Sequence, residues 1–73
     1  MNIEKKLNLE LMGHKVHIQA KDGRELDYIV DEVESGGNSD RYYPNGTGIS
    51  YIILGGYKTI LYADEIESIE ITD

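Results

Sequence analysis

The sequence predicts a small, mostly β domain in which five strands follow a short helix. After Gly13, apolar and polar residues alternate over most of the chain, and Asp-Gly and Gly-Gly pairs separate the alternating segments. Before Gly13, apolar residues recur at a spacing of four. A period of two is typical of strands and a period of about 3.6 is typical of helices. Because 73 residues are enough for one domain, residues 1–73 are expected to fold as a single unit.

Residues 2–12 are the segment in which the helix is expected. The apolar side chains of its stripe are Ile3, Leu7, Leu9, Leu11 and Met12. Asn2 can cap the start of this helix, and Gly13 favours its end because glycine readily adopts the left-handed conformation found there. Residues 7–11 also alternate, so a strand is the other interpretation of the same segment.

Residues 15–20 predict the first strand, and an Asp-Gly turn joins it to the second. The apolar face of the first strand carries Val16, Ile18 and Ala20. The second strand, at 24–34, is apolar in part on both faces. One face carries Leu26, Tyr28 and Val30, and the other carries Ile29 and Val33. We therefore expect a bend or a bulge that turns both sets toward one core.

The next two strands are predicted at 49–54 and 57–62, joined by a Gly-Gly pair. A short turn at 63–65 leads into the last strand. Its alternation points two isoleucines inward, Ile69 and Ile71.

The charge balance disfavours nucleic acid as a partner. Fourteen acidic residues face seven basic ones, a formal net charge of −7, and such a field repels a phosphate backbone. The chain has no cysteine, so it can form no disulfide, no thiolate zinc site and no cysteine nucleophile. We expect no metal and no cofactor. The N-terminal residues contain no apolar run of signal-peptide or membrane-span length, so a cytoplasmic location is expected.

Two stretches resemble the signatures of the Sm family of SH3-like barrels. VHIQAKDGRELDYIVDEVE resembles the first signature, and YADEIESIEI is similar to the second. The resemblance implies a five-stranded Sm-type barrel that assembles into rings, the fourth strand of one subunit pairing with the fifth of the next. Tyr62 and Ala63 stand where the second signature usually has Arg-Gly, and Asp27 and Tyr28 stand near the usual glycine of the bent second strand. The resemblance therefore implies the barrel without the RNA pocket.

Residues 35–48 predict a long loop, which carries four of the eight glycines and the only proline. Arg41, Tyr42 and Tyr43 lie on it, and tyrosine and arginine are enriched in binding hot spots. They could also stack on nucleic-acid bases. The alternative is that one tyrosine folds back to cover the end of the barrel.

Two further groups of residues suggest sites. His14 and His17 are three residues apart, but they straddle the end of the predicted helix and lack a third ligand, so solvent-exposed histidines are favoured over a metal site. The acidic residues fall in two segments, and they are Asp31, Glu32, Glu34, Asp64, Glu65, Glu67 and Glu70. Paired carboxylates can perform acid and base chemistry, but no nucleophile motif or phosphate loop accompanies them, and a solvated acidic face is favoured over an enzyme.

Three hypotheses of function follow. The first is a protein-binding or self-assembling module without catalytic activity, whose assembly edges are 57–62 and 68–71, with edge residues Ile60, Tyr62 and Ile69. The second is an inhibitor of the phage type that imitates nucleic acid and binds a basic partner through Glu65 and Glu67. The third is RNA binding of the Sm type through Arg41, Tyr42 and Tyr43.

Overall fold

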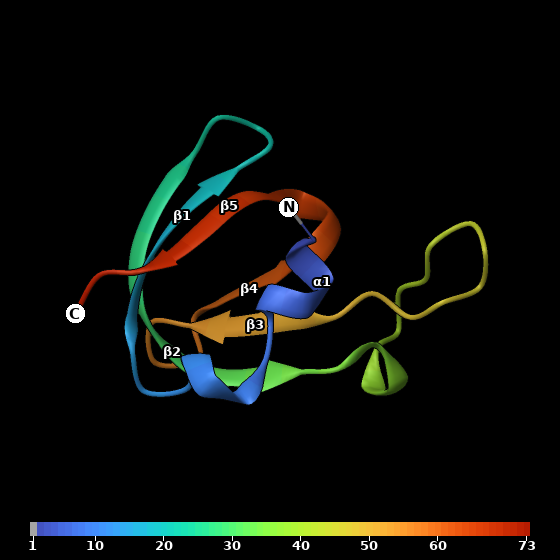
Figure 1. Ribbon diagram of the computed structural model, residues 1–73, viewed down its shortest axis with the longest axis horizontal. Coiled ribbons are helices and arrows are strands. Elements are labelled where there is room, and N and C mark those ends of the chain that lie inside the picture. Colours follow the sequence, from blue (N-terminus) through green and yellow to red (C-terminus); the bar gives the residue numbers. More distant parts are fainter. Residues whose placement is uncertain (1) are drawn as a thin grey trace.

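The computed structural model describes residues 2–73 and shows a curled antiparallel sheet with a short helical segment lying across it (Figure 1). The N-terminal segment contains the helix α1 (Ile3–Lys6) and the 3₁₀ helix η1 (Leu9–Leu11). The strands are β1 (Lys15–Ala20), β2 (Glu25–Glu34), β3 (Tyr51–Leu54), β4 (Thr59–Tyr62) and β5 (Ile66–Ile71). Two more 3₁₀ turns connect them, η2 (Gly36–Asn38) after β2 and η3 (Ala63–Glu65) before β5.

The sheet has the strand order β4-β3-β2-β1-β5, and each neighbouring pair is antiparallel. β4 and β5 are its two edges, and the connection between them is η3 rather than a ladder of hydrogen bonds. The sheet is therefore open. A mostly β domain of five strands with one short helix is confirmed, while the closed SH3-like barrel of the Sm type stays a prediction.

The core lies on the concave side of the sheet, under α1 and η1. Val16 and Ile18 of β1 are completely buried there, and Ala20 is nearly so, which confirms the predicted inner face of this strand. The other fully buried large side chains come from four strands and are Val30, Ile52, Leu54, Leu61 and Ile66. Each of these side chains contributes about 1.5–3 kcal/mol by leaving water, so the curled sheet and its core stabilise each other.

A bulge in β2 confirms the predicted bend, but it turns only part of the two apolar sets toward the core, since Ile29 stays 56% exposed and Tyr28 40% exposed. The first half of β2 pairs with β1 and the second half pairs with β3, and the register shifts between Val30 and Glu32. Val30 and Val33 are both buried, although residues three apart on a regular strand face opposite sides. The extra residue at the bulge is Asp31, and it turns the second half of β2 so that Val33 joins the core.

The N-terminal helix is much shorter than residues 2–12, so that prediction is wrong in extent. Its backbone leaves the helix at Leu7 and Asn8, and a separate 3₁₀ turn follows. The side chain of Asn8 donates to the carbonyl of Lys5 and accepts from the N–H of Glu10, and these local bonds compete with a continuous helix. Asn2 stands at the start of α1, but its side chain makes no capping hydrogen bond.

The predicted inward stripe of this segment is partly right. Leu7 and Leu11 are buried in the core, whereas Leu9 remains 71% exposed. Met12 also stays largely exposed, so neither residue broadens the stripe. Gly13 has the left-handed conformation that was expected, with φ +83°.

β3 and β4 begin later than predicted, at Tyr51 and Thr59. Residues 57 and 58 belong to the turn between the strands. Ile49 is buried, but its N–H donates to Arg41 in the long loop, so it belongs to the base of that loop. In β5, Ile69 is buried as expected. Ile71 lies on the same face but stays 48% exposed, because the core ends before it.

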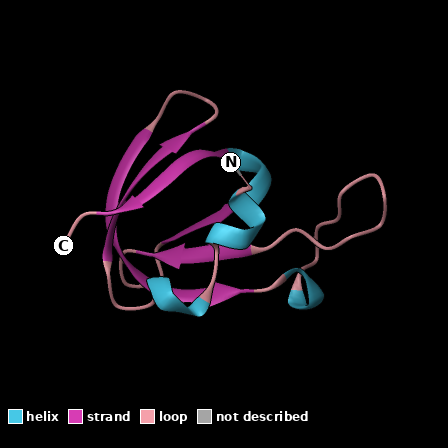
Figure 2. Ribbon diagram, viewed as in Figure 1, coloured by secondary structure: helices cyan, strands magenta, loops and turns pink. Residues whose placement is uncertain are grey.

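The loop between β2 and β3 extends away from the sheet (Figure 2). It covers residues 35–50, slightly more than the predicted 35–48, and contains η2 and an isolated bridge between Tyr42 and Gly48. Gly36 and Gly48 cross at its base with their backbones in direct contact. Among residues 2–73, no helix is long and apolar enough to cross a membrane.

The crossing of Gly36 and Gly48 predicts that Gly48→Ala will destabilise the fold by about 1–3 kcal/mol, because the added methyl group overlaps the carbonyl oxygen of Gly36. Urea unfolding followed by circular dichroism measures the change. Gly37→Ala is the matched control, since its methyl group would meet only the side-chain oxygen of Ser35, at an ordinary contact distance. Equal stability of the two variants would show that the backbones do not cross closely.

Candidate functional site

The two edge strands are the candidate site, because each presents backbone hydrogen-bonding groups on its open side. In an antiparallel pair, residues alternate between those bonded to the neighbouring strand and those whose N–H and C=O point away from it. Ala63 donates to Ser50 across β4 and β3, so Leu61 is also a bonded residue and Ile60 is not. The backbone of Ile60 therefore points to the open side of β4, and its side chain is 52% exposed.

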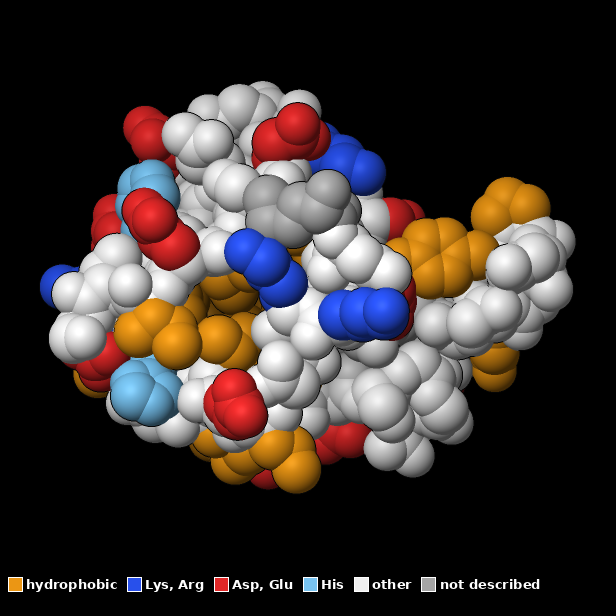
Figure 3. All heavy atoms as spheres, viewed as in Figure 1, with side chains coloured by type: hydrophobic (Ala, Val, Ile, Leu, Met, Phe, Trp, Pro, Cys, Tyr) orange, Lys and Arg blue, Asp and Glu red, His pale blue; other side chains and the backbone are white. Residues whose placement is uncertain are grey.

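The edge strand β5 also has backbone groups that point to its open side. Thr72 donates to the carbonyl of Lys15, so by alternation the backbones of Ile71 and Ile69 point away from β1. Ile71 also lines a groove between the N-terminal segment and β5, of about 420 Å³. The other residues of this groove are Lys5, Lys6, Asn8, Leu11, Ile69 and Glu70. Figure 3 shows basic side chains beside a hollow in which hydrophobic side chains are visible on this face.

Tyr62, at the end of β4, is closed off by other parts of the chain. Its N–H donates to the carboxylate of Glu65 at 3.0 Å, so Glu65 covers the open side of the strand at this point. Arg41 stacks over the Tyr62 ring at 4.6 Å from its centre. Of the predicted edge residues, Ile60 is free to contact a partner. Tyr62 is only partly accessible to a partner, and Ile69 could contact one only through its backbone.

Arg41 is engaged inside the molecule. Its guanidinium binds Asp64 at 2.9 Å and reaches Glu65 at 3.5 Å. The structure thus brings together the predicted loop residue Arg41 and the predicted acidic residue Glu65. Because these carboxylates neutralise Arg41, the loop offers no free guanidinium to a nucleic acid.

The two loop tyrosines have different environments. Tyr43 folds back onto the core, and its hydroxyl donates to Glu4 at 2.6 Å. Burial, together with the hydrogen bond to Glu4, raises the pKa of Tyr43 to about 12. Tyr42 is 63% exposed. Of the predicted group, only Tyr42 presents its ring to a partner.

Glu4 is the centre of a polar cluster that the sequence did not reveal. One of its carboxylate oxygens accepts from the Tyr43 hydroxyl and the Ser50 N–H, and the other accepts from the Ser50 hydroxyl at 2.6 Å. Burial alone would raise the pKa of Glu4, but the hydrogen bonds from Ser50 and Tyr43 outweigh it and the pKa is lowered. The cluster ties α1 to the middle of the long loop at Tyr43 and to its C-terminal end at Ser50.

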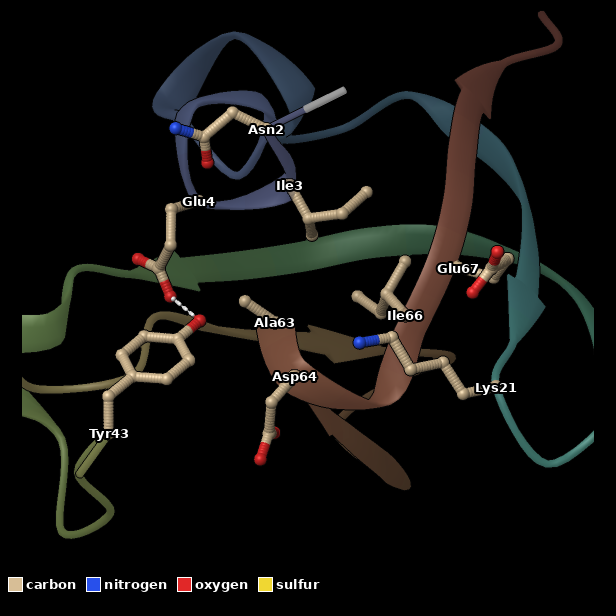
Figure 4. A pocket seen from close by; sticks show the side chains of 9 residues that line it. All are labelled: Asn2, Ile3, Glu4, Lys21, Tyr43, Ala63, Asp64, Ile66 and Glu67. Carbon is tan, nitrogen blue, oxygen red and sulfur yellow. Dashed lines mark hydrogen bonds between the residues drawn. The ribbon is translucent and has the colours of Figure 1, made fainter.

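Glu4 and Tyr43 also line a shallow pocket of about 820 Å³ (Figure 4). Its other residues are Asn2, Ile3, Lys21, Ala63, Asp64, Ile66 and Glu67. Glu67 is exposed, unlike Glu65, which binds Arg41 and the Tyr62 backbone. The carboxylates of the two predicted acidic residues therefore have different environments.

The histidines do not share a site. His14 binds Asp73 at 2.9 Å, and His17 binds Asp27 at 2.9 Å. The hydrogen bond to Asp27 raises the pKa of His17. Within residues 2–73, no group of three or more histidine and carboxylate side chains is placed to hold a metal ion.

Comparisons with protein-family models, with curated proteins and with solved structures gave no match.

The Glu4 cluster predicts a loss of about 1–2 kcal/mol of stability for Glu4→Gln at neutral pH, because a neutral amide accepts these hydrogen bonds less strongly. The folded-state pKa of Glu4 is lowered, so its contribution is complete above the unfolded-state pKa and is lost as the pH falls through the folded-state value. Urea titrations from neutral pH to below pH about 4 should show the two proteins converging. Glu10→Gln, at an exposed position, is the control. A constant difference across this pH range would contradict the assignment.

Proposed function

We propose that the chain is a non-catalytic, self-assembling module of the Sm type, in which β4 of one copy pairs with β5 of the next. The observation that carries the proposal is that these two strands are the edges of the sheet, each with outward-pointing backbone groups. Each edge also has a half-exposed isoleucine, Ile60 on β4 and Ile71 on β5. Pairing the two edges would join the backbone hydrogen-bonding groups that one copy leaves open.

The basic residues beside β5 favour contact with β4 over contact with a second β5. The open side of β4 carries the carboxylate of Glu65 together with its ion-pair partner Arg41, and the groove beside β5 carries Lys5, Lys6 and Glu70. The two lysines beside β5 would meet the carboxylates at the end of β4, whereas a contact between two β5 edges would bring the lysines of both copies together. Such a head-to-tail contact repeats from copy to copy and closes into a ring when the rotation allows it.

The size of the chain supports assembly as well. A domain of 73 residues buries a modest fraction of its surface, and its short N-terminal helix covers only part of the core side. Edge pairing would add burial that one copy lacks, and it would stabilise the folded state by mass action.

Ile60→Pro tests the proposal at β4. Proline removes the N–H that points to the open side and leaves the ladder to β3 intact, so the fold is expected to persist while the oligomer dissociates. Light scattering on a sizing column measures the mass, and circular dichroism checks the fold. Ile60→Thr keeps the N–H and is the matched control, expected to retain the assembly or weaken it slightly.

Ile71→Lys provides a second test at the other edge, because a lysine on an edge strand opposes pairing. Both variants are expected to give the mass of one chain. A monomeric wild-type protein, or an oligomer that neither substitution changes, would rule out the proposal.

A further inference from the structure

The outer face of the β3–β4 hairpin is apolar, although it faces away from the core. Ile52, Leu54 and Leu61 of this hairpin are buried, so the residues that alternate with them point outward. Those outward residues are Tyr51, Ile53, Ile60 and Tyr62. The register pairs Tyr51 with Tyr62 and Ile53 with Ile60, and the two tyrosine rings lie 5.1 Å apart. These four residues and Tyr57 from the turn, five in all, are called the outer patch.

Tyr57 has an unusual backbone conformation. It is the single non-glycine residue within 2–73 with a positive φ, at +64°, and it follows two glycines that also have positive φ. The carboxylate of Asp31 holds this turn by accepting from the N–H groups of Gly56 and Tyr57. A side chain with a Cβ is strained in this conformation, and the ring is nonetheless 62% exposed. A strained residue that displays a large ring to solvent is typical of a binding position.

Two carboxylates of β2 lie beside the outer patch. Glu32 pairs in register with Ile53, and Glu34 pairs with Tyr51, so both lie on the outer face beside the patch. Burial raises the pKa of Tyr51, and the carboxylates of Glu34 and of Asp40 in the long loop raise it further. The pKa of Tyr57 is raised by burial and then by Glu32. Arg41 is neutralised by its own ion pairs, which leaves Lys58 as the basic residue of the turn.

We propose that the outer patch binds a basic, amphipathic segment of a partner protein. Its apolar side chains would cover Tyr57, Ile53 and Ile60, and its lysines or arginines would meet Glu32 and Glu34. The charge decides between occupants: a second copy of this face would bring two acidic rims together, and a nucleic acid would bring phosphates to them. Aromatic residues inside a polar rim are the usual anatomy of a protein interface.

The outer patch shares Ile60 and Tyr62 with the edge of β4, but it uses their side chains rather than their backbone groups. Edge pairing uses backbone groups in the plane of the sheet, whereas the side chains of the outer patch project perpendicular to that plane. The two proposals can therefore fail separately, because Ile71→Lys changes only the assembly edge on β5 and Tyr57→Gly changes only the outer patch.

A synthetic helical peptide of leucine and lysine, with all leucines on one face and a fluorescent label, is the probe. Fluorescence anisotropy measures its binding to the full chain. We expect binding that weakens with salt, and at least about tenfold weaker binding to Tyr57→Gly, since a hot-spot ring is lost. Glycine accepts a positive φ, so this variant should stay folded. Leu9→Ser removes another exposed apolar side chain, on η1, and should bind like the wild type.

The Glu32→Lys, Glu34→Lys double variant provides a second readout, with weaker binding and a smaller dependence on salt expected. A peptide of the same composition with scattered leucines should bind worse than the segregated one. The proposal is overturned by absence of binding, by equal binding of the two peptides, or by equal affinity of the Tyr57→Gly and Leu9→Ser variants. A fall in solution mass of Tyr57→Gly without peptide would identify a second copy as the occupant, and displacement of the peptide by a single-stranded oligonucleotide would identify nucleic acid; either result overturns it.

Discussion

The bulge at Asp31 is the constraint on which the rest of the structure depends. It allows one strand, β2, to pair with β1 along its first half and with β3 along its second half while both halves face one core. The carboxylate of Asp31 then holds the turn between β3 and β4. Because β2 is at the centre of the sheet, β4 and β5 are left at the edges, and the core, the edges and the outer patch all follow from this arrangement.

Local patterns predicted the strands well, because alternation reports directly which side chains face the core. β1, the bend of β2 and the turn at η3 all follow from short stretches of sequence. The helix was less predictable. Its apolar spacing was correct at Leu7 and Leu11, but the spacing does not show that Asn8 makes local hydrogen bonds that end α1. Ile71 shows a related limit, since a pattern gives the face of a residue but not where the core ends.

The polar contacts of the candidate site could not be predicted, because they join residues that are distant in the chain. Tyr43 and Glu4 are 39 positions apart, and Ser50 and Glu4 are 46 apart. Arg41 likewise forms an ion pair with the distant residue Asp64, so it is not the free binding group that its position on the loop suggested. The outer patch did leave a signal in the sequence. The hairpin strands are apolar at successive positions, which a strand needs only when both of its faces are covered.

Amide hydrogen exchange at several protein concentrations tests the central claim, pairing of the edges between copies, most directly. The N–H groups of Ile60 and Ile71 point away from the sheet, so they exchange quickly in a single copy and slowly when another strand accepts their hydrogen bonds. The account predicts that protection of both amides rises with concentration while that of Leu61, bonded within the sheet, stays constant. Rapid exchange of Ile60 and Ile71 at every concentration would contradict it.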